Sequence, residues 1–246
     1  MNKAIVIIPT YNEKENIQKM VQTILLLPVP YDLLIIDDGS PDGTADIVRS
    51  LQPSSPERLF MIERNGKQGL GTAYVMGFQW AIDKKYDFIF EMDADFSHNP
   101  HDLIKLYDAC YNGADLAVGS RYVGGKISVV NWPIGRVIMS YYASSYVRFI
   151  TRMTIGDATA GFVCYRRRLL EAMNLDKVKF VGYAFQIEMK YTAFRLGFKL
   201  DEVPIIFRDR VLGNSKMSMR IFKEAFFGVW NLRFRNWRSY NKVNKK

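Results

Sequence analysis

The 246-residue sequence has few cysteines and no long hydrophobic run. Cys110 and Cys164 are its only cysteines, and neither belongs to a Cys-x-x-Cys motif. This usage favours a reducing, cytoplasmic setting over a secreted, disulfide-stabilised one. Only the apolar residues from Ala4 to Ile8 precede Pro9, which is too short a run for a signal peptide. No uncharged apolar run approaches the roughly 18 to 20 residues that span a bilayer, so we expect a protein that is soluble or lies on a membrane surface.

The sequence also lacks a recognisable nucleic-acid-binding module, although its formal net charge is +9. Residues 205–246 contain 11 Lys/Arg and 2 Asp/Glu, whereas residues 1–204 contain 23 residues of each sign. The positive charge therefore belongs to the C-terminal tail and not to a stripe on the body of the protein. We expect no nucleic-acid partner.

A regular alternation of short apolar runs and amphipathic segments extends from residue 3 to residue 121. The apolar runs predict strands at residues 3–9, 33–36, 59–62, 88–92 and 116–118, and the intervals between them predict helices at about 13–27, after 41, up to 83 and after 100. This β-α-β-α order predicts a single α/β domain whose mostly parallel sheet has helices on both faces. The 48% apolar content is ample for its core.

Polar residues follow three of these strands at the carboxyl end. Asp93 and Asp95 end the fourth strand, and two aspartates at i and i+2 on extended backbone can point the same way. Like charges this close favour a bound cation, and Mg²⁺ and Mn²⁺ prefer oxygen ligands. The clusters at residues 9–13 and 37–40 end the first two strands. Because open α/β folds bind ligands at this edge, we expect a site there; the alternative is a set of solvated acidic loops.

Three glycines, Gly66, Gly69 and Gly71, precede the third predicted helix. They do not fit the Gly-x-Gly-x-x-Gly fingerprint, and the sequence has no P-loop motif. We therefore expect Gly69-Leu70-Gly71 to allow close packing at the start of a helix.

Longer motifs, in a fixed order, resemble those of the family 2 glycosyltransferases. They are Ile-Pro-Thr-Tyr-Asn-Glu (8–13), Ile-Asp-Asp-Gly-Ser-Pro-Asp-Gly-Thr (36–44), Gly-Leu-Gly-Thr-Ala (69–73) and Met-Asp-Ala-Asp-Phe-Ser-His-Asn-Pro (92–100). Further motifs are similar to those of polyprenol-phosphate (dolichol-phosphate) mannose synthase catalytic domains: Gly-Ser-Arg-Tyr (119–122), Asp-Ala-Thr-Ala-Gly-Phe (157–162), Gly-Tyr-Ala-Phe-Gln-Ile-Glu-Met (182–189), Glu-Val-Pro-Ile-Ile-Phe-Arg-Asp-Arg (202–210) and Gly-Asn-Ser-Lys-Met (213–217). The resemblance covers about residues 4–217.

The resemblance implies a GT-A-like (Rossmann-like) three-layer sandwich over residues 1–217. It implies a metal-dependent, inverting enzyme that transfers mannose from GDP-mannose to a polyprenyl (dolichyl or undecaprenyl) phosphate, with Mg²⁺ or Mn²⁺ as cofactor. Two alternatives stay open: the same chemistry with another sugar, such as one donated by UDP-glucose, and a non-catalytic nucleotide-sugar-binding or membrane-adaptor protein.

Roles for individual residues follow from the matching motifs. The resemblance assigns the nucleotide sugar to a set that includes the metal ligands Asp93 and Asp95: Pro9, Tyr11, Glu13, Ile36, Asp38, Asp93, Ala94, Asp95, Arg210 and Lys216. Ser97 stands where the family often has Gln, so it is a weaker candidate near the metal.

The acceptor phosphate is assigned to Arg121 and Arg136, because arginine binds phosphate oxygens in a bidentate manner. A phosphate monoester has a second pKa of about 6 and is already mostly a dianion at neutral pH, so no general base is assigned. The residues expected to act in catalysis are Asp93, Asp95, Arg121, Arg210 and Lys216.

Other polar residues have simpler interpretations. His98 and His101 are expected on the surface at a helix start. Gln186 and Glu188 are expected either to face the acceptor or to belong to a packing helix.

Two stretches have the composition of a membrane-surface segment. Residues 134–150 interleave aromatic and aliphatic residues with arginine, and residues 218–246 form a basic tail that includes an amphipathic helix predicted at 219–240. In that helix the polar stripe comprises Arg220, Glu224, Asn231, Arg235 and Arg238, and the apolar face comprises Phe222, Phe226, Val229, Trp230 and Trp237. We expect a peripheral protein on the cytoplasmic face of a membrane, and a small membrane protein is a possible partner. The alternative is a tail that docks onto the core of the same chain.

Overall fold

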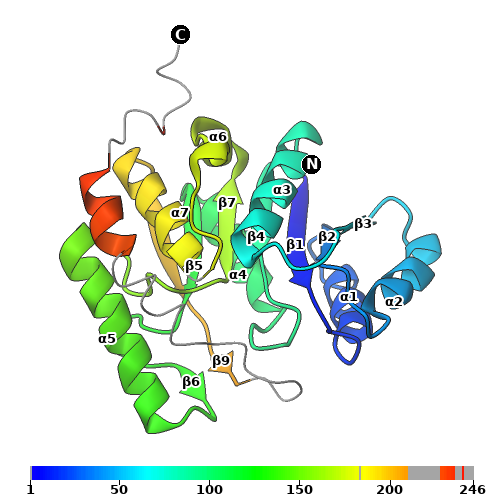
Figure 1. Cartoon of the computed structure of the whole chain (residues 1–246), viewed down its shortest axis with the longest axis horizontal. Coiled ribbons are helices and arrows are strands. Elements are labelled where there is room, and N and C mark those ends of the chain that lie inside the picture. The colour runs from blue at the N-terminus through cyan, green and yellow to red at the C-terminus, as the bar shows by residue number, and fades with distance from the viewer. Residues whose placement is uncertain (1, 183, 210–227, 236–239, 241–246) are drawn as a thin grey trace.

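The computed structural model describes residues 2–182, 184–209, 228–235 and 240. Within these ranges seven strands form one sheet in the order β3-β2-β1-β4-β7-β5-β8 (Figure 1). Their bounds are β1 Ala4–Thr10, β2 Tyr31–Asp37, β3 Leu59–Glu63, β4 Phe88–Glu91, β5 Leu116–Ser120, β7 Val163–Arg166 and β8 Leu200–Pro204. The short strands β6 (Val129–Val130) and β9 (Phe207–Arg208) pair separately, in parallel.

The central sheet is parallel except at β7, which runs antiparallel to both β4 and β5. The predicted mostly parallel α/β sheet is therefore confirmed. Chain order reverses at β1, because β2 and β3 lie on one side of it and β4 on the other. Such a switch point leaves a crevice at the carboxyl ends of the strands, where ligands of open α/β sheets bind.

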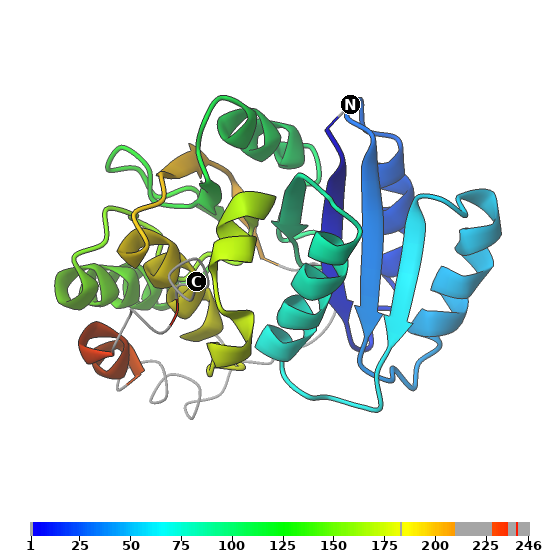
Figure 2. The same ribbon diagram turned by 90° about the horizontal axis from the view of Figure 1, so that it is seen from above.

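Helices cover both faces of the sheet because alternate strand residues point to opposite sides. In β1, Val6 and Ile8 pack toward one layer, whereas Ile5 and Ile7 pack toward the other. Helices α1 (Ile17–Leu25), α2 (Thr44–Leu51) and α4 (Asp102–Tyr111) form the first layer, and α3 (Leu70–Asp83), α6 (Arg167–Ala172) and α7 (Ala184–Arg195) form the second (Figure 2). Two single turns, Gln52–Ser54 and Leu175–Lys177, complete this part of the fold.

The start of α3 bears out the packing role expected for its glycines. A Cβ atom on Gly71 would lie 2.6 Å from the carbonyl oxygen of Phe180, and one on Gly69 would lie 2.9 Å from the Val181 side chain. The Gly71 N–H also donates to the Val181 carbonyl at 2.9 Å. The segment before α7 can therefore approach α3 only because these positions have no side chain.

Helix α5 (Ile134–Thr151) lies at the edge of the molecule, beside the helical segment formed by residues 228–234 (Figures 1 and 2). Val229 and Leu232 of that segment are buried against Val147 and Ile150 of α5 and against Ile187 of α7. In its described part the tail thus packs on the body of the protein, while the predicted boundary at residue 217 lies outside the described residues.

None of the described helices is both long enough and hydrophobic enough to cross a membrane.

Arg235 of the tail is not part of a solvent-facing stripe. Its guanidinium group pairs with the fully buried carboxylate of Glu188, whose other oxygen accepts the backbone N–H groups of Lys179 and Phe180 at 3.0 Å each. Tyr240 donates its hydroxyl proton to the Lys177 carbonyl at 2.8 Å. Glu188 is therefore a residue of a packing helix that anchors the tail, which is one of the two roles left open for it.

Candidate active site

The polar clusters predicted at strand ends do come together at one edge of the sheet. Strands β2, β1 and β4 are neighbours, with Thr10 of β1 opposite Asp37 of β2 and Ile7 of β1 opposite Glu91 of β4. Residues 10–13, 37–40 and 93–95 consequently leave the sheet on the same side, at the switch point beside β1. Three stretches far apart in the sequence therefore line one crevice edge.

The Asp93–Asp95 turn follows β4 directly and is held by local hydrogen bonds. The Asp95 carboxylate is 8% exposed and accepts the Ser97 N–H at 3.0 Å. The Asp93 side chain is 44% exposed, and its backbone N–H donates to Nδ1 of His98 at 3.4 Å. Ala94, between them, is buried in the core. The turn thus presents one buried and one half-exposed carboxylate.

His98 is not the surface residue that the sequence suggested. Its imidazole is 3% exposed and stacks on Phe162 with ring centroids 4.9 Å apart, while Phe207 approaches edge-on at 5.3 Å. Burial lowers the pKa of His98 to about 4, with the Asp95 charge opposing that shift and the Arg121 charge adding to it. The ring is neutral at pH 7, so it packs beneath the aspartate turn and accepts a hydrogen bond from it. His101, by contrast, is exposed as expected.

The residues at this turn fit a divalent cation that is shared with a substrate. Among the described residues, no group of three or more His, Cys, Asp or Glu could hold a metal ion by itself. Mg²⁺ commonly takes one or two carboxylates together with substrate phosphates and water, and Asp93 and Asp95 supply that number of carboxylates. The Ser97 hydroxyl is buried and has no hydrogen-bond partner among the described residues, so one more oxygen is at hand in the same turn.

The two loops on the other side of the switch point are fastened to each other. The Asn12 N–H donates to the Ser40 hydroxyl and the Glu13 N–H to the Thr44 hydroxyl, both at 3.0 Å. The Asp38 N–H donates to the Thr10 carbonyl at 2.9 Å. Residues predicted to contact a nucleotide on these loops are therefore neighbours in space.

Several of these candidates already have protein partners. Arg64 holds the Asp38 carboxylate through Nε at 2.6 Å and Nη2 at 2.5 Å. The Glu13 carboxylate accepts from the Asn16 side chain at 3.1 Å. The Lys67 ammonium lies 3.8 Å from the centroid of the Tyr11 ring. A ligand would meet a preorganised set of acceptors rather than loose side chains.

The remaining nucleotide candidates differ in what they can offer. The Ile36 side chain is fully buried in the core beside α3, so only its backbone is available near the loop that follows β2. Pro9 is partly exposed near the end of β1. Arg210 and Lys216, the predicted cations for the leaving diphosphate, lie outside the described residues.

Arg121 is placed at the end of β5 but is bound by a buried carboxylate. Its Nε and Nη2 atoms each lie 2.6 Å from an oxygen of Asp157, and its backbone N–H donates to the same carboxylate at 3.0 Å. Thr159 accepts from Nη2 at 2.9 Å. The fork formed by Nε and Nη2 is therefore occupied by Asp157.

Arg136 lies near Arg121 because both guanidinium groups face Trp132. Their Cζ atoms are 4.2 Å and 5.4 Å from the centroid of its ring, so they are less than 10 Å apart. Arg136 also donates to Asp209 at 2.9 Å, and the Trp132 Nε1–H is buried without a partner among the described residues. The structure thus brings together the two arginines predicted to bind one phosphate.

Strand β9 links the arginine pair to the aspartate turn. The Phe207 ring contacts both His98, at 5.3 Å, and Trp132, at 5.2 Å. The next residue, Arg208, donates its backbone N–H to the Ser97 carbonyl at 3.2 Å. The metal and acceptor sides of the candidate site are therefore parts of one packed unit.

Beneath the aspartate turn lies a buried polar network that the sequence did not reveal. The Glu91 carboxylate accepts the Tyr165 hydroxyl at 2.9 Å and the Gln186 amide at 2.5 Å, and Lys190 donates to the Ala160 carbonyl at 2.5 Å. Burial raises the pKa of Glu91 and lowers the pKa of Lys190, and each charge counteracts the shift of the other. Gln186 is buried and holds Glu91, the last residue of β4, so its role is in packing rather than acceptor contact.

Comparison with known proteins identifies the class of this site. The model of the family described as "Glycosyl transferase family 2" matches residues 5–173. The chain therefore belongs to the family 2 glycosyltransferases, and the predicted GT-A-like fold and the predicted enzyme class are confirmed.

Two characterised relatives cover nearly the whole chain. A polyprenol monophosphomannose synthase from Mycolicibacterium smegmatis is 45% identical over 95% of this chain and 88% of its own. An undecaprenyl-phosphate mannosyltransferase from Micrococcus luteus is 42% identical over 94% of both chains. Both names agree with the predicted resemblance.

A more distant likeness to a solved structure concerns the fold alone. Glucosyl-3-phosphoglycerate synthase from Mycobacterium tuberculosis, crystallised with Mn²⁺, UDP and glucosyl-3-phosphoglycerate, superposes with a TM-score of 0.67. It is 17% identical, over 94% of this chain and 80% of the other.

Proposed function

We propose that this chain is an inverting glycosyltransferase that moves mannose from GDP-mannose to the phosphate of a polyprenol. The observation that carries the proposal is the similarity to two mannosyltransferases, named for polyprenol and undecaprenyl-phosphate substrates, over nearly their full length. The arrangement of the site supports it, because strand β9 joins the aspartate turn and the arginine pair in a single packed unit.

On the donor side, the nucleotide would bind beside the loops that follow β1 and β2. Glu13 and Asp38 are hydrogen-bond acceptors of the kind that guanine N–H groups and ribose hydroxyls require. Their positions are fixed by Asn16 and Arg64, so little ordering is left for the moment of binding.

Asp93 and Asp95 would hold a divalent cation, Mg²⁺ or Mn²⁺, against the diphosphate. When bound, that ion would neutralise the charge that develops on the leaving group. Mn²⁺ is present with UDP in the fold relative from Mycobacterium tuberculosis, which supports divalent metal use in general. The buried position of Asp95 and its bond from the Ser97 N–H would keep one carboxylate oriented toward the ion. Arg210 and Lys216 are proposed as further cations for the same charge.

On the acceptor side, we assign cations and no general base. A polyprenyl phosphate is already mostly dianionic at pH 7, so it can attack without losing a proton to the protein. Arg136 and Arg121 would hold it, with Asp157 and Trp132 fixing the two guanidinium groups. Because Asp209 occupies Arg136, the phosphate would replace or share that partner.

The acceptor is a lipid, so the enzyme would work at a membrane surface, on the cytoplasmic face where the nucleotide sugar is available. The exposed apolar side chains of α5 support this placement. Those on its outer face are 41% to 82% exposed: Ile134, Ile138, Met139, Tyr141, Tyr142 and Phe149.

The test is a transfer assay with purified protein and undecaprenyl or dolichyl phosphate in detergent. Radiolabelled GDP-mannose and UDP-glucose are compared, with Mg²⁺, with Mn²⁺ and with a chelator, and the label that enters the organic phase is counted. Asp95→Asn is the diagnostic variant, and Asp108→Asn, an exposed position on α4, is its matched control.

We expect metal-dependent transfer from GDP-mannose, a loss of at least a hundredfold in Asp95→Asn, and unchanged activity in Asp108→Asn. Transfer from UDP-glucose alone would refute the sugar assignment but leave the mechanism. No transfer from either donor, with binding of the nucleotide intact, would refute the proposed activity and favour a nucleotide-sugar-binding adaptor.

A further inference from the structure

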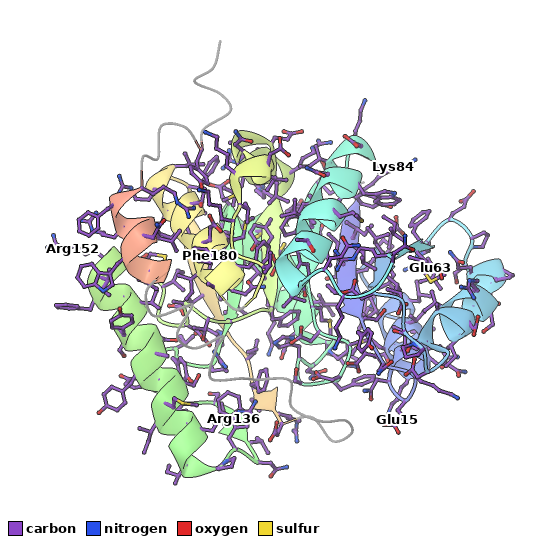
Figure 3. All side chains as sticks on the ribbon, viewed as in Figure 1. Glu15, Glu63, Lys84, Arg136, Arg152 and Phe180 are labelled. Atoms are coloured by element: carbon purple, nitrogen blue, oxygen red, sulfur yellow. The ribbon has the colours of Figure 1, made fainter. Side chains whose placement is uncertain are left out.

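A groove separate from the candidate active site lies between the carboxyl end of α5 and the helical segment 228–234. Its lining consists of three arginines, three aromatic residues and one aliphatic residue: Arg148, Phe149, Ile150, Arg152, Trp230, Arg233 and Phe234. Figure 3 shows Arg152 at this end of α5 and Arg136 toward the opposite end. The groove is therefore a second cationic region on the same helix.

The three arginines bring positive charge to the groove, and no described residue of its lining offsets that charge. None of the described residues that line it is acidic, and no side-chain hydrogen bond or ion pair joins Arg148, Arg152 or Arg233 to another described residue. Elsewhere in the described part of the chain, arginines such as Arg49 and Arg64 have carboxylate partners. Three guanidinium groups around one groove, with no partner among the described residues, favour an anionic ligand, because guanidinium donors match phosphate oxygens.

The aromatic side chains make the same groove apolar at its rim. Phe149 is 82% exposed, Phe234 78% and Trp230 45%, and the Trp230 and Phe234 rings are stacked 6.0 Å apart. Below them, Ile150, Val229 and Leu232 are buried and join the tail segment to α5. The rim is thus held on a rigid base, although it presents large apolar surfaces to solvent.

Aromatic rings beside a cluster of arginines match the boundary between lipid head groups and acyl chains. A free phosphate would satisfy the arginines but would leave the rings in water. A lipid head group in a bilayer satisfies both, because its phosphate meets the guanidinium groups while the rings enter the acyl boundary. This combination selects a bilayer over a soluble anion.

The groove also lies at a useful distance from the predicted acceptor site. Twelve residues separate Arg136 from Arg148 on α5, which corresponds to about 18 Å along a helix that rises 1.5 Å per residue. Four exposed apolar residues of the outer face of α5 lie between these two arginines: Ile138, Met139, Tyr141 and Tyr142. A membrane that contacts the groove would therefore extend along α5 toward Arg136.

We propose that this groove is a docking site for the phosphate head group of an anionic phospholipid in the membrane surface. It would hold α5 along the bilayer, with the Arg121–Arg136 pair turned toward the lipid acceptor. This inference deepens the membrane part of the proposed function, but it is tested by binding alone and needs no turnover.

The experiment measures binding of the whole protein to vesicles of phosphatidylcholine, with and without 30% phosphatidylglycerol, by flotation. The groove variant is Arg148→Gln/Arg152→Gln/Arg233→Gln. Its matched control removes three positive charges from the C-terminal end of the same basic tail: Lys242→Gln/Lys245→Gln/Lys246→Gln. Thermal unfolding of each variant shows that the fold is kept.

We expect the wild-type protein to bind only the vesicles that contain the anionic lipid. Each groove charge near such a surface contributes about 1 kcal/mol, so the groove variant should bind about 100-fold more weakly. The lysine control should lose less than tenfold. Equal weakening of both variants would show diffuse attraction to a basic tail and would overturn the site, as would equal binding to neutral vesicles.

A second pair of variants tests the aromatic rim. Phe149→Ser/Phe234→Ser removes two exposed rings and should weaken binding at least tenfold, because each ring would be withdrawn from the acyl boundary. Leu26→Ser is the control and should change nothing, because Leu26 is 84% exposed directly after α1, away from the groove. An unchanged affinity of the aromatic variant, or full displacement from vesicles by millimolar glycerol phosphate, would indicate a soluble-anion site and overturn membrane docking.

Turnover in detergent separates this inference from the proposed function. The groove variant should keep the wild-type rate of mannose transfer in detergent, because that assay does not require binding to a bilayer. Loss of vesicle binding with retained transfer supports the docking site, whereas the absence of transfer in the wild-type protein refutes the function and not the site.

Discussion

The buried ion pair between Arg121 and Asp157 gives the sharpest prediction about stability. Asp157 is completely buried and accepts three hydrogen bonds from Arg121, at 2.6, 2.6 and 3.0 Å. Asp157→Asn removes the negative charge and leaves the guanidinium group, which is 10% exposed, without its counter-ion. Breaking a buried pair in this way costs about 3–5 kcal/mol. For a chain of this size, that corresponds to a fall of about 6 to 20 °C in Tm.

The assay is urea unfolding followed by tryptophan fluorescence, on the two single variants Asp157→Asn and Arg121→Met and on the double variant. The double variant leaves no unpaired buried charge, so its loss of unfolding free energy should be clearly smaller than the sum of the single losses. Glu63→Gln is the control, because the Arg49–Glu63 pair is about half exposed and should contribute less than about 1 kcal/mol. Additivity of the two single variants within about 0.5 kcal/mol would refute the reasoning.

The same pair predicts a pH dependence. Burial acts to raise the pKa of Asp157, but the Arg121 charge and its hydrogen bonds outweigh burial and lower it below its usual value. Between the folded and unfolded pKa values, the unfolded chain binds a proton that the folded chain does not, so stability falls as the pH drops below about 4. We expect the loss between pH 5 and pH 3 to be smaller in Asp157→Asn; an identical loss would contradict this assignment.

Three further predictions concern packing and the tail. Gly71→Ala should lower the unfolding free energy by at least about 2 kcal/mol, because its Cβ would lie 2.6 Å from a backbone carbonyl oxygen. Gly135→Ala, where a Cβ would meet open space, should stabilise α5 by up to about 1 kcal/mol. Equal denaturation midpoints of the two variants would contradict this prediction. Glu188→Gln and Arg235→Ala should each weaken the attachment of the tail and speed its proteolysis. A tail as resistant to protease as in the wild-type protein would show that the Arg235–Glu188 pair does not anchor it. Lys190→Met should lower the Tm by several degrees, since a buried carbonyl loses its donor; an unchanged Tm would refute that role.

The sheet and the position of the site were predictable from sequence because they depend on local patterns. Continuous aliphatic runs such as Val6–Ile8 are buried on both faces in a parallel sheet, and polar residues directly after them must gather at one edge. The aspartate turn needed no distant residue to be located. Its position at the end of β4 therefore follows from the residues directly before it in the sequence.

What the sequence did not reveal depends on segments that return from far away. His98 is surrounded by polar residues in the sequence, and it is buried because Phe162 and Phe207 come back to cover it. Glu91 ends an apolar run, but its buried partners, Tyr165 and Gln186, come from β7 and α7. Helical periodicity showed that the tail has an apolar face, but not that α5 and α7 cover part of it.

The single antiparallel strand has a consequence for how this protein is made. During synthesis β4 is complete about 70 residues before β7, the strand that pairs with its open edge. At about 5–20 residues per second, this edge waits several seconds on the ribosome with its backbone groups unpaired. Strand β5, which also pairs with β7, waits with it. A nascent chain interrupted in this interval would carry the aspartate turn on an exposed strand edge, which is a template for aggregation and a substrate for chaperones.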